Sequence, residues 1–154
     1  MLVDLGISMG VFYLQYKILP ILKEDLFEIN KILIKEIGVS SLKNLKEHLR
    51  HGIAIKLVDG NKNMVALCLA QEYLTHFSLS YYYVYENQRK KWESLFFFIH
   101  CFSKMQHKPI YVKKNKNYEM YSKYFEETAD KDILRFKNLR EEKEWEELLN
   151  RFQK

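Results

Sequence analysis

Glycine, proline and cysteine are all scarce in this chain of 154 residues. There are five glycines, two prolines and two cysteines, and every glycine lies within the first 60 residues. The later loops therefore lack a glycine-lined phosphate cradle, which needs backbone that turns without a Cβ atom. Cys68 and Cys101 lie in apolar runs and have no metal-ligand spacing. They predict two buried, reduced thiols in an intracellular protein.

Long uncharged hydrophobic runs are missing as well. The apolar N-terminal stretch, residues 1–19, is interrupted by two charged residues and two glycines. It has neither the positive leader of a signal peptide nor the length of a membrane span. The sequence therefore predicts a protein without a signal peptide and without a membrane-spanning helix.

The chain does have enough apolar sequence for one compact domain, with 47% hydrophobic and 29% charged residues. The formal net charge is +5. The positive excess gathers at residues 89–91, 104–108 and 113–116, whereas the last 18 residues are neutral overall. Such clusters can steer an anionic ligand or a nucleic acid, although a solvated basic surface is the simpler interpretation of each.

The hydrophobic pattern predicts alternating strands and helices. Strands are expected at 12–18, 53–58, 64–70, 75–85 and 110–112 and within 128–136; helices are expected at 26–37, 42–49, 91–105, 115–125 and 140–152. Three consecutive antiparallel strands are followed by a strand–helix–strand step. This order predicts a single mixed, mainly antiparallel sheet with helices on both faces.

Residues 81–93 form the most informative segment. An aromatic strand ends at Tyr85, a basic loop follows, and an apolar helix begins. Many folds hold phosphate at such a strand–loop–helix step, because unpaired N–H groups at the helix N-terminus point at the anion. Here the loop has charge where a phosphate cradle normally has glycine.

An opening pattern and a central hairpin resemble those of the GNAT acyltransferase family. Residues 18–20, Ile-Leu-Pro, are similar to the family's opening Ile-Arg-Pro, with leucine in place of the arginine. Asp25 supplies the acidic residue that follows the proline by five positions. Residues 53–70 are similar to the family's central hairpin.

A third match lies later in the chain. Residues 117–125 are similar to a late helix of the family, in which a tyrosine and the final phenylalanine match and Tyr124 replaces a glycine. The resemblance covers residues 12–136 and implies one domain with the acyl-CoA N-acyltransferase fold. Residues 1–11 are then an N-terminal extension, and residues 137–154 are a C-terminal amphipathic helix.

The chain departs from the family in the loop that binds the pyrophosphate of acetyl-CoA. Active members have Gln/Arg-x-x-Gly-x-Gly/Ala, whereas residues 88–93 are Gln-Arg-Lys-Lys-Trp-Glu. Lys91 and Glu93 hold the glycine positions or, in the register that starts at Arg89, Trp92 and Ser94 hold them. Large side chains would fill the phosphate space. The alternative is phosphate capture by side chains, and the resemblance then places the cofactor site at Val84, Gln88, Arg89, Lys90 and Lys91.

The resemblance also implies positions for a general base and a general acid. Glu72 is the first choice as base and His76 the second, while Tyr121 matches the family's acid. A solvated carboxylate is the simpler interpretation of Glu72. An aromatic packing stripe with Tyr118 and Tyr124 is the simpler interpretation of Tyr121. No histidine spacing indicates a metal site.

These departures favour a GNAT-like protein that binds and does not catalyse, with no cofactor. An aromatic strand followed by a basic, glycine-free loop resembles phage-encoded GNAT-like internal virion proteins. That resemblance implies a virion or assembly role, in the cytoplasm or in the virion. One alternative is an active N-acetyltransferase that uses acetyl-CoA. Another is a nucleic-acid-binding module with its aromatic and basic residues at 81–92 and 111–118.

The expected C-terminal helix offers a surface for a protein partner. Its apolar edge consists of Trp145, Leu148, Leu149 and Phe152 on an otherwise charged helix. This edge either packs on its own domain or docks onto a second copy or another virion or assembly component.

Overall fold

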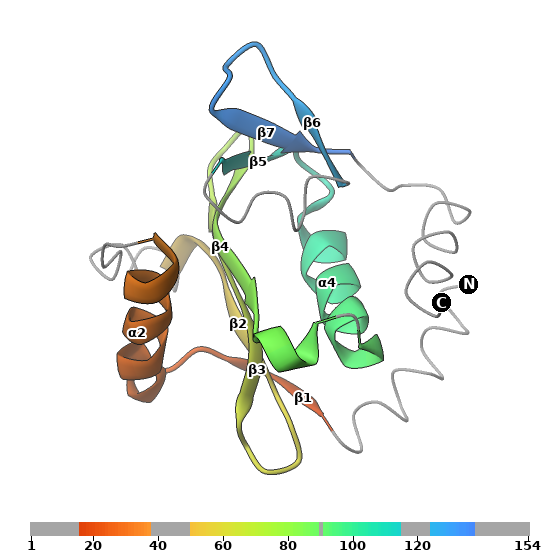
Figure 1. Ribbon diagram of the computed structural model, residues 1–154. Helices are drawn as coiled ribbons and strands as arrows, with labels where there is room; N and C mark the ends of the chain where they lie inside the picture. Colours follow the sequence, from red (N-terminus) through yellow and green to blue (C-terminus); the bar gives the residue numbers. More distant parts are fainter. Residues whose placement is uncertain (1–15, 38–49, 90, 115–123, 138–154) are drawn as a thin grey trace, which may run out of the picture.

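The computed structural model describes residues 16–37, 50–89, 91–114 and 124–137 (Figure 1). They build a seven-stranded sheet in the order β1-β2-β3-β4-β5-β7-β6. The strands are β1 (Lys17–Pro20), β2 (Gly52–Val58), β3 (Met64–Glu72), β4 (Phe77–Val84), β5 (Ile110–Lys113), β6 (Phe125–Glu127) and β7 (Ile133–Phe136). Among the strands of the described residues, only β4 and β5 pair in parallel. The predicted mixed, mainly antiparallel sheet is confirmed.

One helix covers each face of the sheet, α2 (Leu26–Ile37) on one side and α4 (Trp92–Met105) on the other (Figure 1). Short 3-10 turns precede them, η1 (Lys23–Asp25) and η3 (Glu86–Gln88). The apolar core is accordingly divided into two clusters, one on the α2 face and a larger one on the α4 face. Most of α4 is buried, because nine of its 14 residues are covered.

The larger cluster contains both cysteines. Cys68 on β3 and Cys101 on α4 are free and fully buried, as the sequence predicted. Burial raises the pKa of the Cys101 thiol well above its ordinary value. A thiol held in its neutral form is a poor nucleophile, so Cys101 acts as a packing residue.

Asp25 fixes the connection between the first strand and α2. Its carboxylate accepts the backbone N–H of Leu22 at 2.8 Å and the ammonium of Lys56 at 2.6 Å. The side chains of Asp25 and Lys56 are both only 13% exposed, so water screens this ion pair less than a surface pair. The acidic residue five positions after Pro20 thus joins the turn to β2.

The structure differs from the predicted elements at both ends of the sheet. The first strand begins at Lys17 and includes Pro20, which is tolerated there because β1 is an edge strand. Phe125 belongs to β6 and not to a helix, so the prediction of a helix through residue 125 is wrong at that end. Residues 115–123 and the helices predicted at 42–49 and 140–152 lie outside the described residues.

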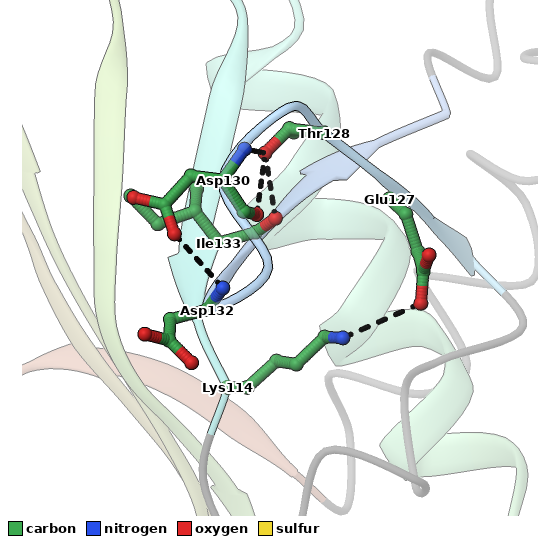
Figure 2. Close-up of polar contacts among 6 residues, drawn as sticks. All are labelled: Lys114, Glu127, Thr128, Asp130, Asp132 and Ile133. Atoms are coloured by element: carbon green, nitrogen blue, oxygen red, sulfur yellow. Dashed lines mark hydrogen bonds and ion pairs between the residues drawn. The ribbon is translucent and has the colours of Figure 1, made fainter.

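The strand predicted within 128–136 is confirmed as β7, and it forms a hairpin with β6, a strand that the sequence did not predict. Figure 2 shows its turn, where the hydroxyl of Thr128 lies 2.9 Å from the carbonyl oxygen of Ile133 and accepts the N–H of Asp130 at 3.2 Å. The Asp130 carboxylate accepts the N–H of Asp132 at 2.9 Å. Side chains that bond to nearby backbone in this way are typical of turns.

In the part of the chain that is described, no helix has both the length and the apolar character to cross a membrane.

Candidate functional site

The strands β4 and β5 separate part of the way along their length. β5 pairs with Phe77, Ser78 and Leu79 only. The β3–β4 register shifts at this point, because Leu69 pairs with Tyr81 while Ala70 pairs with Leu79, which leaves Ser80 as an extra residue. Such a β-bulge bends the strand and increases its twist. The second half of β4 therefore has an edge that β5 does not cover.

Arg89 lies across this open edge at the end of β4. The N–H of Tyr85 bonds to the carbonyl of Val65 on β3, so the Val84 carbonyl, in the same trans peptide group, points away from β3. Arg89 Nε donates to that carbonyl at 2.9 Å. Its guanidinium carbon also lies 5.5 Å from the centre of the Tyr83 ring. The side chain thus covers a backbone acceptor that an extended ligand would need.

Two hydrogen bonds to backbone carbonyl groups stabilise the turn between β4 and α4. Gln88 donates its N–H to the Tyr85 carbonyl at 2.8 Å, and the Ser94 hydroxyl donates to the Gln88 carbonyl at 2.6 Å. Ser94 is a small residue and is buried in the first turn of α4. A small buried residue here matches the second glycine position of the loop register that starts at Arg89, in which Trp92 takes the first.

The N-terminus of α4 has no side-chain cap. Lys91 is the N-cap residue, and its side chain makes no capping bond. Trp92 is 37% exposed and stacks on Phe96 one turn further along, with ring centres 5.5 Å apart. Tyr16 ahead of β1 has a raised phenol pKa, first because of burial and then because of the Glu93 carboxylate. Glu93 is the acidic residue in the first turn of α4.

A groove of about 930 Å³ lies between α2 and the end of β4. A hydrogen bond from the Tyr85 hydroxyl to the Glu28 carboxylate joins its two walls. Burial and this bond together raise the pKa of the Tyr85 phenol. The α2 wall also carries Phe27, Lys31 and Lys35, and the β4 wall carries Arg89.

Protein-family models and curated proteins give no match to the sequence. Solved structures do match the fold. Ard1 from Thermoplasma volcanium superposes with a TM-score of 0.60 at 13% identity, over 78% of this chain and 94% of that one. The ribosomal-protein-S18-alanine N-acetyltransferase from Escherichia coli gives 0.56 at 15% identity, over 79% and 92%. The GNAT family N-acetyltransferase YhbS from Escherichia coli, solved with CoA, gives 0.57 at 12% identity, over 79% and 81%.

The chain has the GNAT fold. At these identities the likeness concerns the fold alone. Of the residues that the sequence proposed for the cofactor, Val84, Gln88, Arg89 and Lys91 lie together at the end of β4 and the start of α4. Lys90 and Tyr121 lie outside the described residues.

Glu72 stands at the opposite end of β4 from these residues. It pairs with Phe77, and seven residue steps separate Phe77 from Val84, which amounts to roughly 20 Å. Lys108 donates to its carboxylate at 2.7 Å and to the Tyr73 carbonyl at 2.9 Å. The pKa of Glu72 is lowered, mainly by the hydrogen bond from Lys108. A lowered pKa makes a carboxylate a weaker base, so the role of Glu72 in proton transfer stays a prediction.

His76, the second choice as base, lies near Glu72 in the turn ahead of β4. Its ring stacks on Tyr73 with centres 4.9 Å apart and meets the edge of Tyr111 on β5 at 5.6 Å. Thr75 lies within hydrogen-bond distance of its Nδ1, at 2.9 Å. The ring is therefore held by aromatic neighbours at the closed end of the β4–β5 pair.

The Glu72→Gln variant should lose a pH-dependent part of its stability. Because the pKa of Glu72 is lower when folded, the carboxylate stabilises the fold above its unfolded pKa. This contribution disappears as the pH falls through the lowered value. We expect a slightly lower thermal midpoint than wild type at pH 7 and equal midpoints in acid. Glu126→Gln, at another exposed carboxylate, is the control; a wild-type advantage that grows in acid would contradict the assignment.

Sequence reasoning missed the contribution of α2 to the groove. Phe27, Lys31 and Lys35 follow the helical spacing of an exposed face, which by itself indicates only a solvated surface. Their place opposite Arg89 depends on the packing of α2 on the sheet, which no local pattern reports. The only signal in the sequence was the four-residue spacing of Phe27, Lys31 and Lys35, which does not indicate what the face lies against.

Proposed function

We propose that this protein is a GNAT-fold binding protein that does not transfer acyl groups. The observation that carries the proposal is the bond from Arg89 Nε to the Val84 carbonyl at 2.9 Å. The pantetheine arm of CoA is a chain with two amide groups, and an open strand edge holds such a chain through its backbone groups. With Arg89 in place, the last carbonyl of the open edge is already bonded.

The first turn of α4 supports the same proposal. In the loop register that starts at Arg89, Trp92 takes the first glycine position, and Glu93 is an acidic residue in the first turn of the helix. A carboxylate there opposes an incoming pyrophosphate, since like charges repel at short range.

The first-choice base, Glu72, is paired with Lys108, which makes it a weaker base for proton abstraction from an amine. The second choice, His76, is stacked on Tyr73.

A second candidate is an acetyl-CoA-dependent N-acetyltransferase, and one observation favours it. The N-terminus of α4 lacks a side-chain cap, so its N–H groups are available to an anion. In that case Arg89 and Lys91 hold phosphate through their side chains. Solved neighbours include YhbS in complex with CoA and Arabidopsis thaliana Naa50 in complex with a bisubstrate CoA analogue.

The proposal takes its specific form from the resemblance to phage-encoded internal virion proteins. We place the protein in a virion or in phage assembly, where it acts by binding. Its partner is a protein, either a second copy or another assembly component. The C-terminal amphipathic helix, residues 137–154, is the proposed contact surface.

Titration calorimetry with acetyl-CoA separates the two candidates. We expect no binding at micromolar concentrations for the wild-type chain, because the edge acceptor and the phosphate space are both taken. YhbS from Escherichia coli, which has been solved with CoA, is the positive control. A micromolar dissociation constant for the wild-type chain would overturn the proposal.

The variant Arg89→Ala gives the direction of the effect, and Lys104→Ala, at an exposed position on α4 outside the proposed site, is the matched control. If Arg89 occupies the edge, its removal leaves acetyl-CoA affinity unchanged or raises it. If Arg89 holds phosphate in an enzyme, its removal weakens binding that is already measurable. Loss of measurable binding in Arg89→Ala therefore establishes the second candidate.

A further inference from the structure

The groove between α2 and the end of β4 carries three cations from two walls. Lys31 and Lys35 are four residues apart, so they project from the same face of α2. Arg89 reaches the groove from the β4–α4 turn. Cations from distant parts of the chain that face one cavity raise the local concentration of anions there.

The same groove presents an aromatic ring to solvent. Phe27 in the first turn of α2 is 72% exposed, and the ammonium of Lys31 lies 4.5 Å from its ring centre. On the opposite wall, Tyr83 is covered by the guanidinium of Arg89 at 5.5 Å. Lys31 lies over one face of the Phe27 ring, and the large exposed fraction of Phe27 leaves the rest of the ring for stacking, whereas the Tyr83 ring is buried and is part of the wall.

Two carboxylates set the amount of negative charge that the groove accepts. Glu28 accepts a hydrogen bond from Tyr85, and Glu86 lies at the exposed rim. Three cations against two carboxylates leave a single net positive charge among these lining residues. This balance suits a ligand with one phosphate and a planar ring. It does not suit a highly charged polyphosphate.

We infer that the groove binds a nucleotide unit, with its base stacked on Phe27 and its phosphate between Lys35 and Arg89. A base stacked on an aromatic side chain beside a basic groove is how single strands are bound without sequence preference. The unit belongs either to a single-stranded oligonucleotide or to a free nucleoside monophosphate. The inference goes beyond the proposed function. The two share Arg89, whose Nε bonds to Val84 at the β4 edge while its side chain also lines the groove, but nucleotide binding requires neither the presence nor the absence of acyl transfer.

Fluorescence anisotropy with a labelled twelve-residue oligothymidylate tests the inference on the full chain. We expect binding whose affinity falls with added salt, with a log–log slope of about −0.7 for the one phosphate held in the groove. Competition with thymidine monophosphate identifies the source of the unit. If thymidine monophosphate displaces the oligonucleotide at concentrations similar to the oligonucleotide's dissociation constant, the natural ligand is a free nucleotide. If thymidine monophosphate does not displace it, the natural ligand is a single strand.

Matched variants place the binding in this groove. Phe27→Ala should weaken binding about tenfold through lost stacking. Ile34→Ala, also exposed on α2 but outside the groove lining, should leave it unchanged. Lys35→Ala should weaken binding several-fold and flatten the salt slope, whereas Lys104→Ala on α4 should not. Absence of binding by both probes, or equal effects of Phe27→Ala and Ile34→Ala, would overturn the inference.

Discussion

Replacement of Phe102 by alanine is expected to lower the free energy of unfolding by about 4 kcal/mol. Phe102 is 1% exposed, and its ring centre lies 4.5 Å from that of Phe98 and 4.6 Å from that of Phe136. Phe125 and Tyr82 also pack against it, both at 5.9 Å. The side chain therefore joins α4 to β4 and to the β6–β7 hairpin, and its removal leaves a cavity that none of these elements can fill alone.

Urea denaturation measures this loss, and Phe27→Ala is the control because its ring is 72% exposed. An exposed ring away from the core should change the unfolding free energy by less than about 0.5 kcal/mol. Since small domains have only about 5–15 kcal/mol of stability, the Phe102 variant should unfold at a much lower urea concentration. A loss below about 1 kcal/mol would contradict the packing of β6 and β7 on α4.

Gly52→Ala is expected to cost about 3 kcal/mol, since overpacking of this kind displaces backbone. Gly52 begins β2 and pairs with Gln71 on β3. A Cβ atom at this position would lie 2.0 Å from the Ala70 carbonyl oxygen and 3.0 Å from the Gln71 Cα. Both contacts are with backbone, so a rotamer change in a neighbour cannot relieve them, and β2 must move away from β3.

Thermal unfolding and urea denaturation of Gly52→Ala test this close approach. His51→Ala, at the exposed residue directly before it, serves as the control and should be nearly neutral. A soluble Gly52→Ala protein with wild-type stability would contradict the β2–β3 spacing. Because β2 and β3 carry the sheet to which β4 is added, we expect the Gly52 variant also to lose any ligand binding at the end of β4.

Elements with a strong hydrophobic period were predictable from sequence. The stripe of α2, the apolar run of α4 and the turn between β2 and β3 are all found where expected. In that turn the Asp59 carboxylate accepts two backbone N–H groups, from Asn61 and Asn63, at 2.9 Å each. These features are local, because their side chains and spacing act within a few residues of each other.

The shortest strand, β6, was not predictable, although the four-residue strands β5 and β7 were. β6 has three residues, Phe125, Glu126 and Glu127, of which only the first is buried, and it forms a strand through its pairing with β7. Likewise the bulge at Ser80 has no local sequence signature. It follows from the register that β4 adopts on β3 and from the loss of its partner β5 after Leu79.

The basic, glycine-free segment after the aromatic strand was evident from sequence alone. What its residues contact was decided by the tertiary structure. Sequence established that Arg89 follows β4, but its bond to the Val84 carbonyl needs the edge that β5 leaves open. The groove opposite Arg89 needs α2 to pack across the sheet, more than 50 residues away in sequence. A sequence determines composition and local period directly, whereas contacts between distant segments exist only once the chain has folded.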